Sequence, residues 1–203
     1  MIISHEGKTP VVHPTAWVAP DATVYGDVVI GAHTRVLFGA RIIAEGGQIA
    51  IGSHCIVMEN AVVRSTARHS AHIGDHCLLG PNTHVVGCTV DDEVFIATGA
   101  AVFHGARLGK GSEVRINGVV HLKSFLPAGA TVPIGWVAVG DPIAILPPDQ
   151  HEAIWERQMP LNFPLEVYGF HREEADMIKI TTRLSESLAS HERDKIVAET
   201  RRR

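Results

Sequence analysis

Aliphatic residues recur at every sixth position along most of the sequence. The series begins as Val18, Val24, Ile30, Val36 and Ile42. It resumes as Ile51, Val57 and Val63, then as Ile73, Leu79 and Val85, and finally from Val90 in the same steps to Val132. Such a period fits neither an α-helix nor the plain two-residue alternation of a strand. What repeats is therefore a short strand followed by a corner.

Small or β-branched residues form a second column, four positions after most of these aliphatic anchors. The column reads Ala22, Val28, Thr34, Ala40, Cys55, Ala61, Ala67, Cys77, Thr83, Val94, Ala100, Ala106 and Ser112. Small side chains at this position let the chain turn inward at each corner without overfilling a narrow interior. Three such units close one triangular coil, so the pattern predicts an all-β parallel solenoid of about six coils.

The repeat ends near residue 147, where the composition changes. Three prolines lie in the segment 135–149, and Asp149 is expected to cap a helix over 151–158 that stops at Pro160. A second helix is expected over 172–198, with an apolar face of Ala175, Ile178, Leu184 and Leu188. We therefore divide the chain into a solenoid over 1–147 and a helical extension over 148–203. The extension is expected to pack on the solenoid or on a neighbouring subunit.

Composition agrees with a narrow aliphatic core, because 45% of the 203 residues are hydrophobic and only 5% are aromatic. A net charge of -4 gives no footprint of nucleic-acid binding. No apolar run is long enough to cross a membrane, and the opening MIISHEGKTP has no signal-peptide pattern. We expect a soluble, cytoplasmic protein. Cys55, Cys77 and Cys88 have neither zinc-ribbon nor redox spacing, so they are expected to be small core residues.

Four segments carry a more specific pattern, an aliphatic residue followed by glycine and, four residues after the anchor, a small residue. They are IGAHTR at 30–35, IGSHCI at 51–56, IGDHCL at 73–78 and LGKGSE at 108–113. Over residues 11–147 the chain resembles the hexapeptide-repeat proteins, which implies a left-handed β-helix. The left hand comes from the resemblance alone, because parallel crossovers are otherwise right-handed.

The six-residue period is interrupted between Ile42 and Ile51, between Val63 and Ile73, and between Val85 and Val90. These interruptions, with the sequence Val-Gly-Cys at 86–88, resemble the γ-class carbonic anhydrases. That resemblance implies a homotrimer with a zinc ion held by three histidines at the subunit interface.

The positions that correspond to the three zinc ligands hold Arg64, Pro81 and Val86. None of these side chains supplies the imidazole nitrogen on which an open zinc site depends. The family's arginine and aspartate in the first interruption correspond to Ala44 and Gly46. The resemblance therefore implies a relative that has lost the usual zinc site, and no metal ligands are predicted.

Two histidines are candidate catalytic residues. His84 precedes the corner at Val85, and His104 lies one coil beyond Gly87, so both are expected near the position of the lost zinc. Each can serve as a general base or rebuild a divalent metal site. The alternative is a hydrogen-bonded histidine at a subunit interface.

Other histidines have different expected places. His33, His54 and His76 occupy equivalent positions in successive coils, which predicts a ladder of rings about 5 Å apart along a solvated edge. The alternative is that adjacent rings of that ladder bind a metal ion together. His69 and His72 lie in the loop of the second interruption, near the expected substrate entrance.

Arg64 and Glu59 are candidate substrate-binding residues. In a trimer the two side chains are expected to approach each other across a subunit boundary. We predict that Arg64 binds a carboxylate or bicarbonate through paired, charge-assisted hydrogen bonds. The alternative is a structural ion pair between Arg64 and Glu59.

Several functions stay open at this stage. The first is a zinc-free relative of γ-carbonic anhydrase that binds or transforms a small anionic metabolite at the subunit interface, without a predicted cofactor. The second is a coenzyme-A-dependent acyltransferase that uses an acyl donor and His84 or His104. The others are a carbonic anhydrase with a divalent metal at a relocated site and a non-enzymatic scaffold. Fold alone chooses among none of them.

Overall fold

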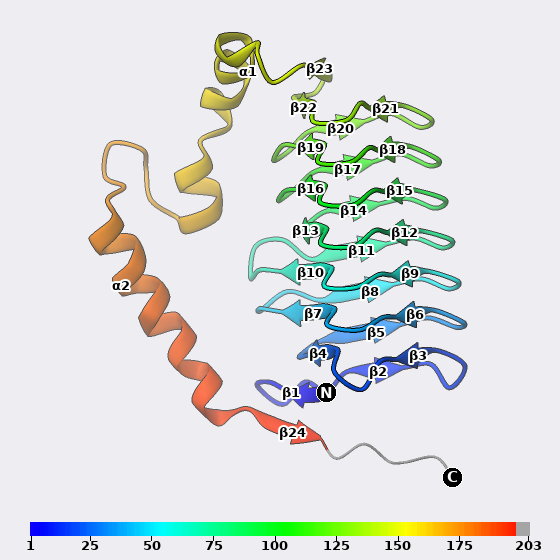
Figure 1. Ribbon diagram of the computed structural model, residues 1–203. Helices are drawn as coiled ribbons and strands as arrows, with labels where there is room; N and C mark the ends of the chain where they lie inside the picture. The colour runs from blue at the N-terminus through cyan, green and yellow to red at the C-terminus, as the bar shows by residue number, and fades with distance from the viewer. Residues whose placement is uncertain (198–203) are drawn as a thin grey trace.

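The computed structural model describes residues 1–197, which form a triangular parallel β-solenoid followed by a helical segment (Figure 1). Three sheets run along the solenoid, because each turn of the chain adds one short strand to each of them. Sheet 1 contains, in spatial order, β23 (Ala144–Leu146), β22 (Val137–Val139), β19 (Val119–Val120), β16 (Ala101–Val102), β13 (His84–Val86), β10 (Val62–Ser65), β7 (Arg41–Ala44), β4 (Thr23–Tyr25), β1 (Ile2–Ser4) and β24 (Lys195–Val197).

Sheets 2 and 3 contain seven strands each. Sheet 2 contains β2 (Val11–Val12), β5 (Val28–Ile30), β8 (Ile49–Ile51), β11 (Ala71–Ile73), β14 (Thr89–Val90), β17 (Arg107–Leu108) and β20 (Phe125–Leu126). Sheet 3 contains β21 (Thr131–Val132), β18 (Glu113–Val114), β15 (Phe95–Ile96), β12 (Leu78–Leu79), β9 (Ile56–Val57), β6 (Arg35–Val36) and β3 (Trp17–Val18).

The solenoid is a left-handed β-helix, as predicted, but it is longer than the expected six coils. Sheet 1 has ten strands, of which only β23 and β24 pair antiparallel, so its parallel strands define about eight turns. The prediction was too low because β1 and β2 precede Val18, where the counted series begins, and β22 follows Val132, where it ends.

The two predicted columns form the core of the solenoid. Every anchor from Val24 to Val132 is buried, and so is every residue of the small column except Ala67. Ala67 is exposed because it lies in a hairpin closed by a bridge between Thr66 and His69, not at a corner. The three cysteines are buried and free, as expected for core residues.

The glycine that follows an anchor allows neighbouring turns to approach closely. An ideal Cβ placed on Gly52 would lie 2.7 Å from the backbone carbonyl of Gly74 and 2.3 Å from the Oδ1 atom of Asp75. Real Cβ atoms do not approach backbone atoms so closely, so any larger residue would separate the turns. This explains why glycine accompanies the aliphatic anchor in several of the repeats.

The segment after the solenoid contains α1 (His151–Gln158), η1 (Met159–Leu161), η2 (Pro164–Tyr168), α2 (Met177–Leu188) and η3 (Ala189–Arg193). The first predicted helix is present, but Gln150 and not Asp149 precedes it, without a side-chain cap. The second predicted helix is shorter than 172–198, because Asp176 caps its start and residues 195–197 form β24 instead. Residues 198–203 of the predicted extension lie outside the described part.

This segment returns along the side of the solenoid that carries sheet 1 (Figure 1). It ends where β24 pairs antiparallel with β1, with Ile196 opposite Ile3. The buried residue of α2 is Ile180, whereas Ile178, placed on the apolar face by the sequence analysis, is 79% exposed. No helix within residues 1–197 has the length and hydropathy needed to span a bilayer.

Candidate functional site

A cavity of about 530 Å³ lies between sheet 1 and the returning segment, and we call it the side cavity. Strands β10 and β13 supply Arg64, His84 and Val86 to one wall, and the turn after β16 supplies His104. The opposite wall is formed by η2 and α2. The side cavity thus brings together three of the four residues singled out in the sequence: Arg64, His84 and His104.

Arg64 forms an ion pair that the sequence analysis did not foresee. Its Nη2 atom donates to Oε2 of Glu45 at 2.9 Å, and the other carboxylate oxygen of Glu45 lies 2.8 Å from Nε2 of His191. The Arg64 side chain stays 43% exposed, which leaves further guanidinium donors available. Glu59 has no ion-pair partner within residues 1–197, so its pairing with Arg64 across a subunit boundary stays a prediction.

His191 belongs to a polar cluster that connects residues 191–194 to the first turns of the solenoid. Its Nδ1 atom lies 2.9 Å from the Tyr25 hydroxyl and 3.1 Å from Oδ2 of Asp194, while His5 Nδ1 lies 2.7 Å from Oδ1 of Asp194. Burial raises the pKa of Tyr25. Burial acts to raise the pKa of Asp194, but its hydrogen bonds outweigh this and lower it. Asp194 is therefore a carboxylate at neutral pH.

A second polar cluster fastens η2 to the hairpin of the second interruption. Glu166 Oε1 lies 2.9 Å from Nε2 of His69, and its other oxygen forms an ion pair with Lys123. Burial opposes ionisation of Glu166, but the bonds to Lys123 and His69 lower its pKa. The His69 ring in turn packs edge-on against the ring of His104, with 5.7 Å between centroids.

His104 is a neutral imidazole in the wall of the side cavity. It is only 7% exposed, and burial together with the nearby His69 lowers its pKa to about 4. Its Nδ1 atom has no hydrogen-bond partner within residues 1–197. Burial and the charge of Arg64 also lower the pKa of His84. Neutral imidazoles of this kind form hydrogen bonds with a bound molecule, and their lowered pKa values make them weaker bases than a free histidine.

Two further arginines reach the side cavity from outside the repeat. Arg68 Nη1 donates to the carbonyl oxygen of Leu165 at 3.0 Å, and the Arg183 guanidinium lies over the ring of Phe170, 5.3 Å from its centroid. Neither arginine has a carboxylate partner among the described residues. The sequence analysis missed both, because they lie in an interruption and in the extension, where no periodic pattern marks them.

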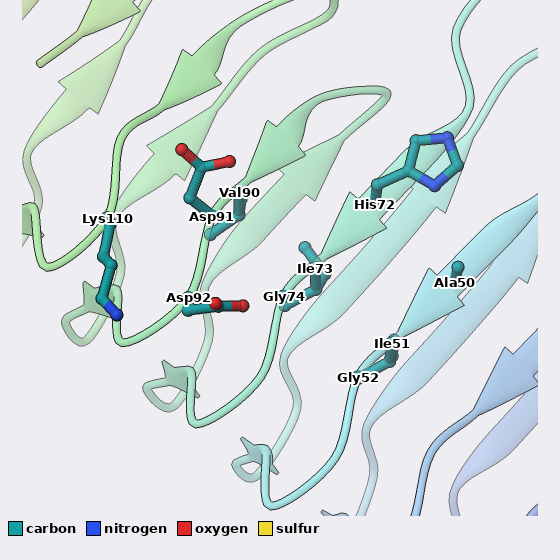
Figure 2. A pocket seen from close by; sticks show the side chains of 10 residues that line it. All are labelled: Ala50, Ile51, Gly52, His72, Ile73, Gly74, Val90, Asp91, Asp92 and Lys110. Carbon is teal, nitrogen blue, oxygen red and sulfur yellow. The ribbon is translucent and has the colours of Figure 1, made fainter. Parts of the chain in front are cut away.

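The remaining histidines lie elsewhere. His33, His54 and His76 form the predicted ladder, with ring centroids 4.8 and 5.0 Å apart, and all are exposed. His72 lies in a shallow depression on sheet 2, away from His69, which contacts Glu166 and His104. Figure 2 shows His72 at the opposite end of that depression from Lys110, and the side chains do not converge on one point. This depression therefore does not form a catalytic arrangement.

The residues at the three zinc-ligand positions do not fit the zinc site of the γ-carbonic anhydrases. Arg64 is a cation already paired with Glu45, Val86 is 3% exposed and apolar, and Pro81 has no side-chain donor. Within residues 1–197 no three histidine, cysteine, aspartate or glutamate side chains are grouped as metal ligands. No step of a mechanism is therefore assigned to a zinc ion.

The buried anchors, the glycine-bearing repeats and the triangular coil define the chain as a hexapeptide-repeat protein with a left-handed β-helix. No family model matches the sequence. Its homologues include gamma carbonic anhydrase 1 of Arabidopsis thaliana mitochondria, 32% identical over 128 residues, which are 60% of this chain and 46% of the relative. Another is the carnitine operon protein CaiE of Escherichia coli, 26% identical over 124 residues, 61% of this chain and 60% of the relative.

Solved structures agree on the fold. A hexapeptide transferase family protein from Anaplasma phagocytophilum aligns with a TM-score of 0.64 and 18% identity, over 94% of this chain and 93% of that one. A putative acetyltransferase from Bacillus cereus aligns with a TM-score of 0.63 and 17% identity, over 95% and 93%. The match with gamma carbonic anhydrases spans about half the length of those relatives. The activity of this protein therefore has to be argued from its own site.

Proposed function

We propose that the protein is a γ-carbonic-anhydrase-like homotrimer that binds or transforms a small anionic metabolite in the side cavity, without zinc at the family's usual site. The observation that carries this proposal is the charge balance of the cavity wall. Both carboxylates, Glu45 and Glu166, are paired with cations of the chain. Arg68 and Arg183 have no carboxylate partner within residues 1–197, so the wall carries unbalanced positive charge.

Arg64 supplies a donor group suited to an anion. A guanidinium is planar and offers paired donors that match a carboxylate or bicarbonate, and the bond to Glu45 holds it in place. His104, neutral and unpartnered at Nδ1 among the described residues, lies in the same wall and is able to form a hydrogen bond with a bound molecule. The homotrimer is the assembly that the family resemblance implies.

Thermal unfolding with added anions tests the proposal. Bicarbonate, acetate, succinate and phosphate are titrated separately, and at least one is expected to raise the unfolding temperature saturably. Arg64→Ala should remove that stabilisation. Arg115→Ala, which removes an exposed arginine paired with Glu113 on sheet 3, should preserve it. Stabilisation by none of the anions, or an unchanged response of Arg64→Ala, would overturn the proposal.

A coenzyme-A-dependent acyltransferase is the second candidate, and the position of His104 favours it. An imidazole beside a cavity is positioned to receive the proton of an acceptor hydroxyl or amine, and this role requires that bound substrate raise the lowered pKa of His104. Saturable stabilisation by acetyl-coenzyme A, together with acetyl transfer lost in His104→Gln, would support this function over the first. A protein that responds to neither anions nor acetyl-coenzyme A would match the scaffold, and about one tightly bound metal per subunit would match a relocated metal site.

A further inference from the structure

Arg68 and Arg183 converge on one point of the side cavity, beside Gly169. An ideal Cβ placed on Gly169 would lie 3.1 Å from Nη2 of Arg68 and 3.3 Å from Nη1 of Arg183. Gly169 has a φ of 76°, which favours glycine, and the absence of a side chain there lets both guanidinium groups approach its backbone. Two guanidinium groups from separate parts of the chain therefore face the same small volume.

Neither arginine forms an ion pair within residues 1–197, because the carboxylates that line the cavity, Glu45 and Glu166, are paired with Arg64 and Lys123. Two unit charges about 4 Å apart repel by about 1 kcal/mol in water and by more near a protein surface. Both guanidiniums are nevertheless held in place, Arg68 by the Leu165 carbonyl oxygen and Arg183 by the Phe170 ring. Each keeps further N–H donors available, because these contacts occupy only part of the group. The arrangement suits one group that carries two negative charges.

The neighbouring wall of the side cavity is apolar. Ile180, Leu184 and Leu188 follow one another at intervals of four along α2, so their side chains share one helix face, and all three line the side cavity. Val86 lines the cavity from the solenoid side. A ligand held at Gly169 by its charged end thus has apolar surface beside it for an organic body.

We infer that the anion of this site is a phosphomonoester, whose phosphate lies between Arg68 and Arg183 beside Gly169 and whose organic body lies along α2. This inference rests on the proposed anion-binding function and narrows its ligand class. A phosphomonoester carries nearly two negative charges at neutral pH and offers three acceptor oxygens, which match two guanidinium forks. Arg64, already balanced by Glu45, then contacts another polar group of the same ligand.

Calorimetric titration with two probes of similar shape and different charge tests the inference. Phenyl phosphate is doubly negative at pH 8, whereas benzenesulfonate carries one charge. Phenyl phosphate is expected to bind at least about tenfold more tightly, since only its second negative charge balances the second guanidinium, and one additional interaction between charged groups contributes about a factor of ten or more. Arg68→Gln and Arg183→Gln should each reduce that preference to about threefold or less.

Arg172→Gln is the matched control, because Arg172 also lies over an aromatic ring, that of Trp155, and does not line the side cavity. It should keep the full preference for phenyl phosphate. The unfolding temperature and circular dichroism of each variant establish that it folds, and ³¹P NMR of phenyl phosphate with the unaltered protein gives a measurement independent of the variants. The expected result there is a saturable change in chemical shift.

Equal affinity for the two probes, no saturable binding of phenyl phosphate, or an unchanged preference in both arginine variants would overturn the inference. The proposed function stands in those cases if bicarbonate, acetate or succinate still stabilises the protein in an Arg64-dependent way. The proposed function is overturned together with the inference only when no anion stabilises the protein in an Arg64-dependent way.

Discussion

Arg64 and Glu45 form an ion pair across two neighbouring turns of the solenoid, with 2.9 Å between Nη2 and Oε2. Arg64 lies beside Ile43 in the register of sheet 1, so Glu45 follows that strand closely enough to reach it. The same carboxylate contacts His191, which lies just after α2. One side chain therefore both orients the candidate ligand-binding arginine and holds the returning segment against the solenoid.

Glu45→Ala is expected to lower the free energy of unfolding by about 1–3 kcal/mol, because the half-buried Arg64 loses its hydrogen-bonded carboxylate and His191 loses a nearby negative charge. Urea unfolding measures this change. Glu59→Ala is the control and should alter stability by less than about 0.5 kcal/mol, since Glu59 has no ion-pair partner within residues 1–197. An equal loss in Glu59→Ala would instead support the pairing with Arg64 across a subunit boundary.

Acid should release the returning segment from the solenoid. The folded-state pKa values of Glu166 and Asp194 are lowered, so their contributions to stability are complete above the unfolded-state values of about 4 and are lost as pH falls through the folded-state values. Hydrogen exchange of residues 164–194 should therefore accelerate between about pH 5 and pH 3. Glu166→Gln should weaken that dependence, and an exchange rate independent of pH, after correction for intrinsic chemistry, would contradict the assignment.

His104 should titrate near pH 4 in the folded protein, because burial lowers its pKa to about 4. The unfolded chain binds this proton near pH 6.5, so stability is lost as pH falls from there toward the folded-state value. The lowered pKa of His104 corresponds to a loss of about 3 kcal/mol in the free energy of unfolding once the pH is below the folded-state pKa. NMR titration of the imidazole signals measures it, and a value near 6.5 for His104 would refute the buried neutral state.

Gly52→Ala should destabilise the solenoid by about 2–3 kcal/mol, because the added methyl group would meet the backbone of the next turn. Gly111→Asn is the control. Gly111 has a positive φ that asparagine tolerates, and nothing lies within 4 Å of an added Cβ. Thermal and urea unfolding compare the two variants. Similar stabilities would mean that close packing between turns does not explain the glycine.

Much of the fold was predictable because each turn repeats the same two constraints. A buried anchor such as Ile96 and a small corner residue such as Ala100 leave a six-residue signal in every turn. The number of turns was harder to predict, because β1 and β22 lie beyond the counted series. Residues 195–197 were wrongly predicted as helix, since their strand depends on pairing with β1 and not on local sequence.

The candidate site was predictable only where it lies on the repeat. The family resemblance placed Arg64 at a zinc-ligand position with His84 and His104 near it, and all three line the side cavity. The side chains that reach the site from distant segments were not predicted. His69 and Glu166, for example, are in contact although they lie 97 positions apart in the sequence. No spacing rule within a repeat predicts such a contact, which depends on how the extension folds back.

The pairing of β24 with β1 has a consequence for assembly in the direction of the solenoid axis. The terminal turn of a parallel solenoid presents unpaired backbone groups onto which another molecule is able to add in register. In sheet 1 an antiparallel strand covers each end, β24 at one and β23 at the other. An antiparallel strand does not continue the parallel ladder, so the chain carries within itself an obstacle to end-to-end growth into fibres.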